Sequence, residues 1–300
     1  MEIGVVVVQN LAWARWRDRV LRVEELGYDT VYVWDHLVHR TQGLHDPMFD
    51  GFGLLAGIAP MTSRLRLGTM VASPTLRHPL LLAKHAVTVD QLSGGRLTLG
   101  IGAAGVARDY QSLGMQAWSK PEQVERFRET VELVDTALRG GSSYAGRHWS
   151  GSDFSVAPGP VQQPRPPMTL AAHGPRTLRI AAQHADTWNS VTPRDRTREE
   201  ALALFDERSA ALSRAAEDLG RDRSAVARSV FVGSNHWPAL ASVEAFRDAA
   251  LAYAERGVHE IVLPHPDHPA EAALGHGPCA PDLVERLADS GVLAELHALA

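Results

Sequence analysis

Short apolar runs alternate along the chain with longer stretches of helical periodicity. The run Ile3 to Val8, for example, is followed by an amphipathic stretch from about Trp13 to Leu26 that stops at Gly27. Strands buried between two layers of helices have this short, mostly apolar character, so the pattern predicts an α/β protein with parallel strands. The predicted strands cover residues 3–8, 30–34, 65–71, 96–101, 168–172, 186–191, 226–232 and 260–263.

The predicted helices fall between these strands and give eight strand–helix units. They cover residues 13–26, 52–60, a helix before Gly94, 108–114, 122–138, 177–184, 196–219, 243–256 and 281–299. Eight units in 300 residues predict a single (β/α)8 TIM barrel domain. The alternative is a doubly wound open sheet. It is disfavoured because no glycine-rich fingerprint with an acidic residue about 20 positions later follows the first strand.

The regular alternation breaks between the fourth and fifth strands. We expect an insertion there, at about residues 106–166. Its part from Gly140 to Pro167 is rich in Gly, Ser and Pro. That part is interpreted either as a hairpin that covers the barrel mouth or an interface, or as a purely structural loop.

The stretch from Asp90 to Gly105 crosses a whole layer of the predicted barrel. Gly94 and Gly95 supply the backbone freedom to end the preceding helix. Asp90 and Arg96 lie at the amino end of the strand, where residues usually serve stability, and we expect both to be structural. The glycines beyond Leu99 lie at the carboxyl end, where such folds bind ligands, and they either contact a ligand or allow close packing.

Composition narrows the class of protein. A net charge of −5 with 45% hydrophobic and 22% charged residues is ordinary for a soluble globular protein and argues against nucleic acid as the main partner. The apolar run at residues 3–8 is too short to span a bilayer and lacks the features of a secretory signal, so we expect no membrane partner and a cytoplasmic location. Cys279 is the lone cysteine, which excludes intrachain disulfides. The two lysines, Lys84 and Lys120, are not at strand ends, which argues against Schiff-base chemistry.

Asp35 and His36 form the sharpest polar pair, because they follow the second strand at its carboxyl end. A histidine at this rim can donate a hydrogen bond to a ring or transfer a proton near neutral pH, and an adjacent acid can orient a neighbour. The alternative is a structural histidine.

A second polar segment, Ala171 to Thr177, follows the fifth strand. Gly174 and Pro175 open a helix whose free N–H groups and positive dipole end attract an anion, and Arg176 can add charge. The alternative is simply a well-capped helix. Trp188, Asn189, Arg194 and Arg196, at and beyond the sixth strand, are further residues that can reach an anion.

A metal site is not predicted. His259, His265, His268 and His276 lie among prolines without a helical His-x-x-x-His pair or a convergent set of carboxylates. The first strand ends in Gln9 and Asn10 rather than in the paired histidines of metal-dependent barrel hydrolases.

Taken in order, several segments resemble the luciferase-like flavin and deazaflavin oxidoreductases, a (β/α)8 family. The resemblance covers most of the chain and is strongest at Asp90-Gln-Leu-Ser-Gly-Gly-Arg-Leu-Thr-Leu-Gly-Ile-Gly102. The other matching segments are Leu26–His36, Leu67–Val71, Pro160–Pro164 and Ala182–Asn189.

The resemblance implies that the ring of coenzyme F420, or alternatively FMN, lies across the barrel mouth against a non-prolyl cis peptide. By position this bond is Met70-Val71. It also implies a coenzyme phosphate after the fifth strand, His36 and Asp35 as catalytic residues, and a homodimer. The residues expected to bind the coenzyme are Met70, Val71, Gly102, Ala103, Ala104, Ala171, Ala172, His173, Gly174, Arg176 and Thr177. Gly105 stands where some relatives carry a glutamate acid, which puts a sugar-phosphate dehydrogenase in doubt.

Four functions follow in order of preference. The first is hydride transfer between coenzyme F420 and a small organic substrate, in which the coenzyme carries the chemistry and the protein orients the reactants. The second is an FMN-dependent monooxygenase, the third a non-catalytic coenzyme-binding protein, and the fourth a metal-dependent hydrolase. The loops at residues 40–50, 110–120 and 144–154, which would read the substrate, give no identity for it.

Overall fold

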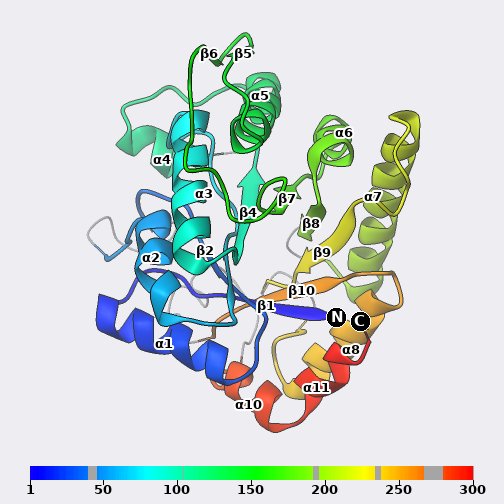
Figure 1. Cartoon of the computed structure of the whole chain (residues 1–300). Helices are drawn as coiled ribbons and strands as arrows, with labels where there is room; N and C mark the ends of the chain where they lie inside the picture. The colour runs from blue at the N-terminus through cyan, green and yellow to red at the C-terminus, as the bar shows by residue number, and fades with distance from the viewer. Residues whose placement is uncertain (40–45, 104, 192–195, 234–237, 267–279, 300) are drawn as a thin grey trace.

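Eight parallel strands close into a barrel in the computed structural model, which describes residues 1–39, 46–103, 105–191, 196–233, 238–266 and 280–299 (Figure 1). The order around the barrel is β1-β10-β9-β8-β7-β4-β3-β2, and β1 closes it by pairing with β10 in the register Val5 to Leu263. The predicted barrel is therefore confirmed. The strands are β1 (Glu2–Val6), β2 (Thr30–Val33), β3 (Arg66–Thr69), β4 (Leu97–Gly102), β7 (Met168–Ala171), β8 (Thr187–Val191), β9 (Ala227–Phe231) and β10 (Glu260–Pro264).

Helices surround the strands, and their ends follow local chemistry. Helix α3 ends at Gly94 in the left-handed conformation, at φ +68°, as its sequence predicts. Helix α7 begins with a capping box in which the side chains of Thr197 and Glu200 each bond the other residue's backbone N–H. The helices that follow the strands are α1 (Trp13–Glu25), α2 (Gly51–Ile58) with the 3₁₀ turn Ala59–Met61, α3 (Pro79–Ser93), α6 (Pro175–His184), α7 (Arg198–Asp218) and α8 (Val243–Ala254).

The closing helix differs from its prediction. The sequence pattern predicts one helix over residues 281–299, whereas the structure has α10 (Leu283–Asp289) and α11 (Val292–His297). Gly291 separates them at φ +80°, a conformation that cannot continue a right-handed helix. The two termini lie side by side next to β1 in Figure 1, and the amino group of Met1 donates to the carbonyl of Leu296 at 2.8 Å.

The insertion contains two helices and a small hairpin. Helices α4 (Ala107–Ser112) and α5 (Lys120–Leu138) precede the antiparallel pair β5 (Tyr144–Ala145) and β6 (Ser150–Gly151). The Glu129 carboxylate on α5 accepts the backbone N–H groups of Arg147, His148 and Trp149 at 3.0, 2.8 and 3.0 Å. Trp149 also packs edge-on against His78, the cap of α3, at 5.0 Å between ring centroids. The contacts described for the hairpin are thus with α5 and with the start of α3.

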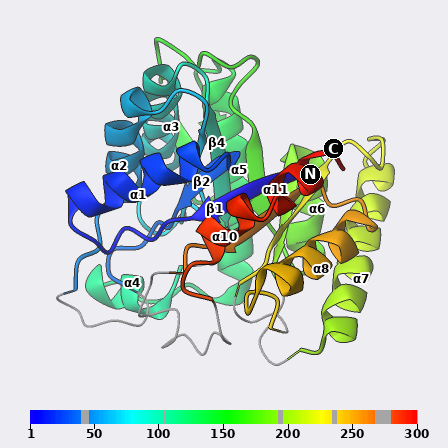
Figure 2. The ribbon, with the colours of Figure 1, turned by 90° about the horizontal axis from the view of Figure 1, so that it is seen from below.

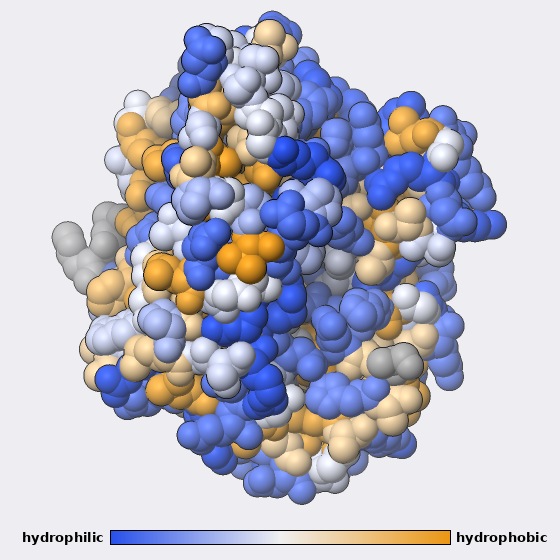
Figure 3. Space-filling model, in the orientation of Figure 1, coloured by the Kyte–Doolittle hydropathy of each residue, from blue (hydrophilic) through white to orange (hydrophobic). Residues whose placement is uncertain are grey.

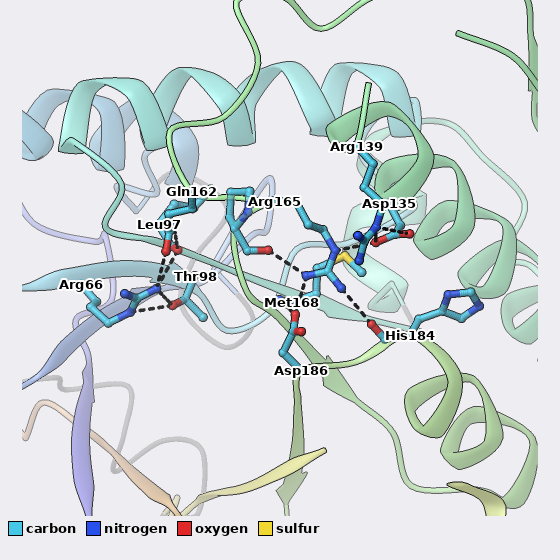
Figure 4. A network of polar contacts seen from close by, with 11 residues as sticks. Arg66, Leu97, Thr98, Asp135, Arg139, Gln162, Arg165, Met168, His184 and Asp186 are labelled. Atoms are coloured by element: carbon cyan, nitrogen blue, oxygen red, sulfur yellow. Dashed lines mark hydrogen bonds and ion pairs between the residues drawn. The ribbon is translucent and has the colours of Figure 1, made fainter. Parts of the chain in front are cut away.

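Polar side chains tie the returning segment to the amino end of the barrel (Figure 4). The buried guanidinium of Arg165 pairs with Asp135 of α5 and Asp186 before β8. Gln162 bonds the carbonyl of Leu97 at 2.8 Å, and Arg66 donates to Thr98 beside it.

The structural roles predicted for Asp90 and Arg96 are confirmed. The Asp90 carboxylate accepts the backbone N–H groups of Val161 and Gln162 at 2.7 and 3.1 Å. Arg96 donates to carbonyl oxygens of the preceding connection and of its own turn, namely those of Ala59, Thr62, Leu65 and Ser93.

The barrel interior has a polar layer beneath an apolar one. Glu260, which is fully buried, accepts hydrogen bonds from Tyr32 at 2.7 Å and Ser229 at 2.6 Å, and Asn189 donates to Ser229 at 3.0 Å. Toward the carboxyl ends of the strands lies a separate apolar cluster. It consists of Val6, Val8, Tyr32, Trp34 and Val262, with Met48, Met70 and Phe231 packed against them. This cluster forms an apolar floor below the mouth.

The outer surface is mixed in character. Figure 3 shows one face of the molecule, where hydrophilic side chains surround scattered apolar patches. Among the helices described, none combines the length and apolar character needed to cross a bilayer.

Candidate functional site

His36 follows β2 at the carboxyl end of the barrel and is held by a residue from the insertion. Its Nδ1 lies 2.8 Å from Oδ2 of Asp109 on α4, and the other oxygen of Asp109 accepts the backbone N–H of Leu37 at 3.0 Å. Asp109 is fully buried, while the His36 side chain is 15% exposed. No residue in the described part of the chain bonds Nε2 of His36. One ring nitrogen is therefore anchored, and the other has no hydrogen-bond partner among the described residues.

Helix α4 makes a further contact with the segment after β2. Arg108 donates to the carbonyl oxygen of His39 at 2.6 Å. Tyr110 is buried, and its ring packs edge-on against Trp118 at 5.6 Å. Figure 2 shows α4 apart from α1, α2 and α3, toward the lower edge of the view.

The structure gives Asp35 partners other than His36. The Asp35 carboxylate is buried and accepts two bonds from the Arg77 guanidinium, at 2.6 and 2.8 Å, and one from the backbone N–H of Ser73 at 2.8 Å. Arg77 also lies over the ring of Phe52, with its guanidinium carbon 5.0 Å from the centroid. Asp35 therefore joins the end of β2 to the loop after β3, and the acid that orients His36 is Asp109.

The peptide bond between Met70 and Val71 is cis, as the family resemblance implies. Both residues are partly exposed at the exit of β3, and Met70 belongs to the apolar floor. The chain then runs beside β4, where the N–H of Ala72 donates to Gly100 at 2.7 Å and the N–H of Gly102 donates to Ala72 at 3.0 Å. The exit of β3 is thus fixed by main-chain bonds to β4.

Glycines in and after β4 allow this close approach. A Cβ on Gly100 would lie 1.9 Å from the carbonyl oxygen of Thr69, and one on Gly102 would lie 2.4 Å from Cγ2 of Val71. The sequence allows two interpretations of these glycines, ligand contact and close packing, and the geometry supports close packing. The space beside the Cα of Gly102 holds Val71, and the expected contact of Gly102 with a coenzyme stays a prediction. Ala103 is partly exposed at the same rim, and Ala104 lies outside the described residues.

Side chains crowd the position of Gly105. A Cβ there would lie 2.4 Å from Oγ1 of Thr75 and 3.1 Å from the ring of Tyr110. The acid beside His36 is Asp109, four residues further along the chain.

Helix α6 begins at the rim beyond β7 and is capped by its own residues, which is compatible with both interpretations of this segment, an anion site and a well-capped helix. Gly174 is its cap in an extended conformation, and Thr177 both accepts from the N–H of Gly174 at 3.1 Å and donates to its carbonyl at 2.9 Å. Pro175 has no N–H, so the first free donors of the helix are those of Arg176 and Thr177. The Arg176 side chain is exposed beside them, and Ala171 is partly exposed.

His173 and Ala172 support this rim from below. Burial, with a smaller contribution from Arg208, lowers the pKa of His173 to about 4, so its ring is neutral at neutral pH. Its Nε2 accepts the backbone N–H of Val191 at 3.1 Å, which ties the exits of β7 and β8 together. The carbonyl of the buried Ala172 accepts the indole N–H of Trp188 at 2.7 Å. His173 therefore adds no positive charge for an anion.

Residues at the sixth predicted strand do not reach the rim as expected. Trp188 and Asn189 are both buried, and Asn189 points to Ser229 in the barrel interior. Arg196 is exposed 3.7 Å from Glu200, and Arg194 lies outside the described residues.

Within the described ranges no group of three metal-binding side chains comes together. Nε2 of His259 lies 3.6 Å from Oε2 of Glu2, and His265 is buried after β10. His268, His276 and Cys279 lie outside the described residues.

The model of the luciferase-like monooxygenase family matches residues 1–277. The chain belongs to this family. Similar proteins include the F420-dependent glucose-6-phosphate dehydrogenase of Microbacterium testaceum, 30% identical over 57% of this chain and 51% of that one. The flavin-dependent trigonelline monooxygenase oxygenase component of Acinetobacter baylyi is 33% identical over 43% of this chain and 36% of that one. The matches thus span about half or less of these relatives.

Solved structures agree on the fold. The coenzyme F420-dependent tetrahydromethanopterin reductase of Methanopyrus kandleri has a TM-score of 0.73 at 17% identity, covering 94% of this chain and 99% of that one. The relatives include both F420-dependent and flavin-dependent enzymes. They therefore support a redox enzyme without selecting its coenzyme.

Two residues of the site escaped prediction from the sequence. Asp109 and Arg77 both lie beyond the carboxyl end of a barrel strand, the end where this fold gathers functional groups. That position is the signal that could have drawn attention to them, but it does not identify their partners.

Proposed function

We propose that this protein is an oxidoreductase that transfers a hydride between coenzyme F420 and a small organic substrate at the barrel mouth. The observation that carries the proposal is the anchored His36, with its Nε2 uncommitted, at the same rim as the Met70-Val71 bulge and the apolar floor. When bound, the coenzyme would supply the hydride chemistry.

The residues present fit a flat heterocycle with an anionic tail. Trp34, Met70 and Phe231 contribute to an apolar floor on which a ring can rest. The N–H groups of Arg176 and Thr177 at the start of α6 can bind a phosphate, and the Arg176 guanidinium adds positive charge. Met70 and Val71 are the groups of the β3 exit that would contact the ring.

His36 would move the proton that accompanies the hydride. When a C–H bond beside an O–H gives up its hydride, the hydroxyl proton must leave as the carbonyl forms, and it returns in the reverse direction. The unbonded Nε2 of His36 can take up or release that proton. Asp35, held by Arg77, would act by fixing the rim on which His36 stands.

An anaerobic titration of the apoprotein with F420 and with FMN, each oxidised and reduced, tests the coenzyme. We expect F420 to bind, with a change in its absorbance, and reduced F420 to support turnover without dioxygen. If neither coenzyme binds at a micromolar protein concentration, the proposal is contradicted.

The second function is an FMN-dependent monooxygenase, which the similarity to the trigonelline monooxygenase favours. It predicts dioxygen consumption with reduced FMN. Anaerobic turnover with reduced F420 excludes it.

A non-catalytic coenzyme-binding protein is distinguished by His36→Ala. An enzyme retains coenzyme binding in this variant and loses turnover by about 10²–10⁴-fold, the usual contribution of proton transfer. His297→Ala is a matched control, because His297 lies on α11 and bonds Asp29, which precedes β2 at its amino end, away from the mouth. If the parent protein binds coenzyme but turns over no member of a broad substrate panel, the binding protein is the better description.

The proposal includes a homodimer, which rests on the family resemblance. Sedimentation equilibrium measures it directly, and a monomer at micromolar concentration would contradict it.

A further inference from the structure

We infer that Asp109 is a positioning residue that fixes the tautomer of His36, so that Nε2 carries the lone pair of the ring. The inference rests on the proposed function and assigns a role to an acid outside the eight strand–helix units. It is carried by the two bonds of the Asp109 carboxylate, to Nδ1 of His36 at 2.8 Å and to the backbone N–H of Leu37 at 3.0 Å.

The carboxylate can only accept hydrogen bonds when it is ionised, so its bond to Nδ1 requires a proton on Nδ1. In the neutral imidazole the proton is then absent from Nε2. Nε2 becomes the acceptor, which is the form needed to take a proton from a substrate hydroxyl.

Asp109 is held in place from several directions. Its neighbour Arg108 bonds the carbonyl of His39, and Tyr110 packs on Trp118 and shares a 3.4 Å hydrogen bond with Thr75. These contacts fix α4 against the exits of both β2 and β3. The carboxylate therefore has one orientation relative to His36, which a catalytic group requires of its supporting residues.

The two bonds predict an unusual effect of Asp109→Asn. The N–H of Leu37 needs an acceptor, so the amide oxygen of the new side chain stays on that side. Its NH₂ group then faces Nδ1 of His36. An NH₂ donor requires Nδ1 to accept, which moves the ring proton to Nε2 and removes the base from the mouth.

The tautomer can be read in the apoprotein, without coenzyme. Two-bond ¹H–¹⁵N correlation spectra of ¹⁵N-histidine-labelled protein at about pH 8 distinguish the two neutral forms, and His36→Ala identifies the signals of His36. We expect a proton on Nδ1 in the parent and on Nε2 in Asp109→Asn. Asp18→Asn, which changes an exposed carboxylate on α1, is the matched control and should leave the spectrum of His36 unchanged.

Kinetics give the second readout. Asp109→Asn should lower kcat by at least about 100-fold and leave coenzyme affinity within about 3-fold, because the ring contacts and α6 are untouched. If Asp109→Asn does not fold, Asp109→Ala replaces it. In that variant we expect both tautomers of His36 and a similar loss of kcat.

The outcomes separate this inference from the proposed function. Unchanged His36 signals in both Asp109 variants, or a parent-like kcat in either, overturn the role of Asp109 alone. Failure of the parent to bind F420 or FMN overturns the proposed function, and the spectra of the apoprotein still decide whether Asp109 sets the tautomer.

Discussion

The side-chain hydroxyl of Thr69 on β3 forms two hydrogen bonds with the backbone of Gly100 on the neighbouring strand β4. Oγ1 of Thr69 accepts the N–H of Gly100 at 3.1 Å and donates to its carbonyl at 2.8 Å. A Cβ on Gly100 would lie 1.9 Å from the main-chain oxygen of Thr69. The close approach of β3 to β4 just before Met70 therefore requires that residue 100 has no side chain.

Gly100→Ala should destabilise the protein by about 3 kcal/mol, at the upper end of the cost of overpacking, because a main-chain oxygen cannot rotate away. Urea unfolding measures the change. Gly174→Ala is the matched control, since the nearest atom to its Cβ would be 3.9 Å away at Oγ1 of Thr177. Equal midpoints for the two variants would contradict the prediction.

Asp35→Ala should cost about 3–5 kcal/mol, because it leaves the Arg77 guanidinium buried beside Phe52 without its bidentate partner. Thermal or urea unfolding measures the loss. Asp18→Ala removes an exposed carboxylate paired with Arg17 and should change stability by less than about 0.5 kcal/mol. If Asp35→Ala loses no more stability than the control, the ion pair between Asp35 and Arg77 contributes little to the stability of the protein.

Glu260→Gln should change how stability depends on pH. Burial raises the pKa of Glu260, and the hydrogen bonds from Ser229 and Tyr32 only partly offset it. Between the unfolded value of about 4.3 and the raised folded value, the unfolded chain releases the proton while the native state keeps it, so the native protein loses stability as pH rises. Glu260→Gln lacks this loss. Its stability relative to the parent should therefore grow from about pH 4 toward neutrality, by up to about 1.4 kcal/mol per pH unit. Parallel urea profiles at acid and neutral pH would refute this.

Glu129→Gln should release the hairpin formed by β5 and β6. Burial alone would raise the pKa of Glu129, but the backbone N–H groups of His148, Trp149 and Arg147 outweigh it and lower the pKa. In the parent this stabilisation is present above about pH 4.3 and is lost as pH falls through the lowered value. The amide variant should lose about 1.5–3 kcal/mol already at neutral pH. Hydrogen exchange at residues 147–149 should become at least about 10-fold faster while the strands of the barrel stay protected. Unchanged exchange there would contradict the prediction.

Much of the fold could be predicted because local chemistry marks the ends of its elements. Gly27 and Gly94 end helices with positive φ, and each strand is a short apolar run between polar segments. The prediction of a single closing helix is wrong because one glycine is tolerated inside a helical pattern, so Gly291 does not by itself mark a helix end. Its left-handed conformation depends on how α10 and α11 pack, which the sequence pattern does not contain.

The site was less predictable because its partners come from distant segments. The position of His36 at a strand end could be predicted, but adjacent residues of an extended chain point to opposite sides, so Asp35 could not serve as its partner. The acid that does so lies 73 residues away on α4. In the same way, Gly102 makes room for Val71, which follows β3, and only the folded barrel creates this relationship.

Helix α4 has only six residues and lies outside the repeating strand–helix units, yet it supplies the acid beside His36. On the role inferred for Asp109, exchanges within this short segment would alter reactivity. A change of chemistry would then not require a change in the barrel strands. Natural variants at positions 105–112 are the place to look for new activities.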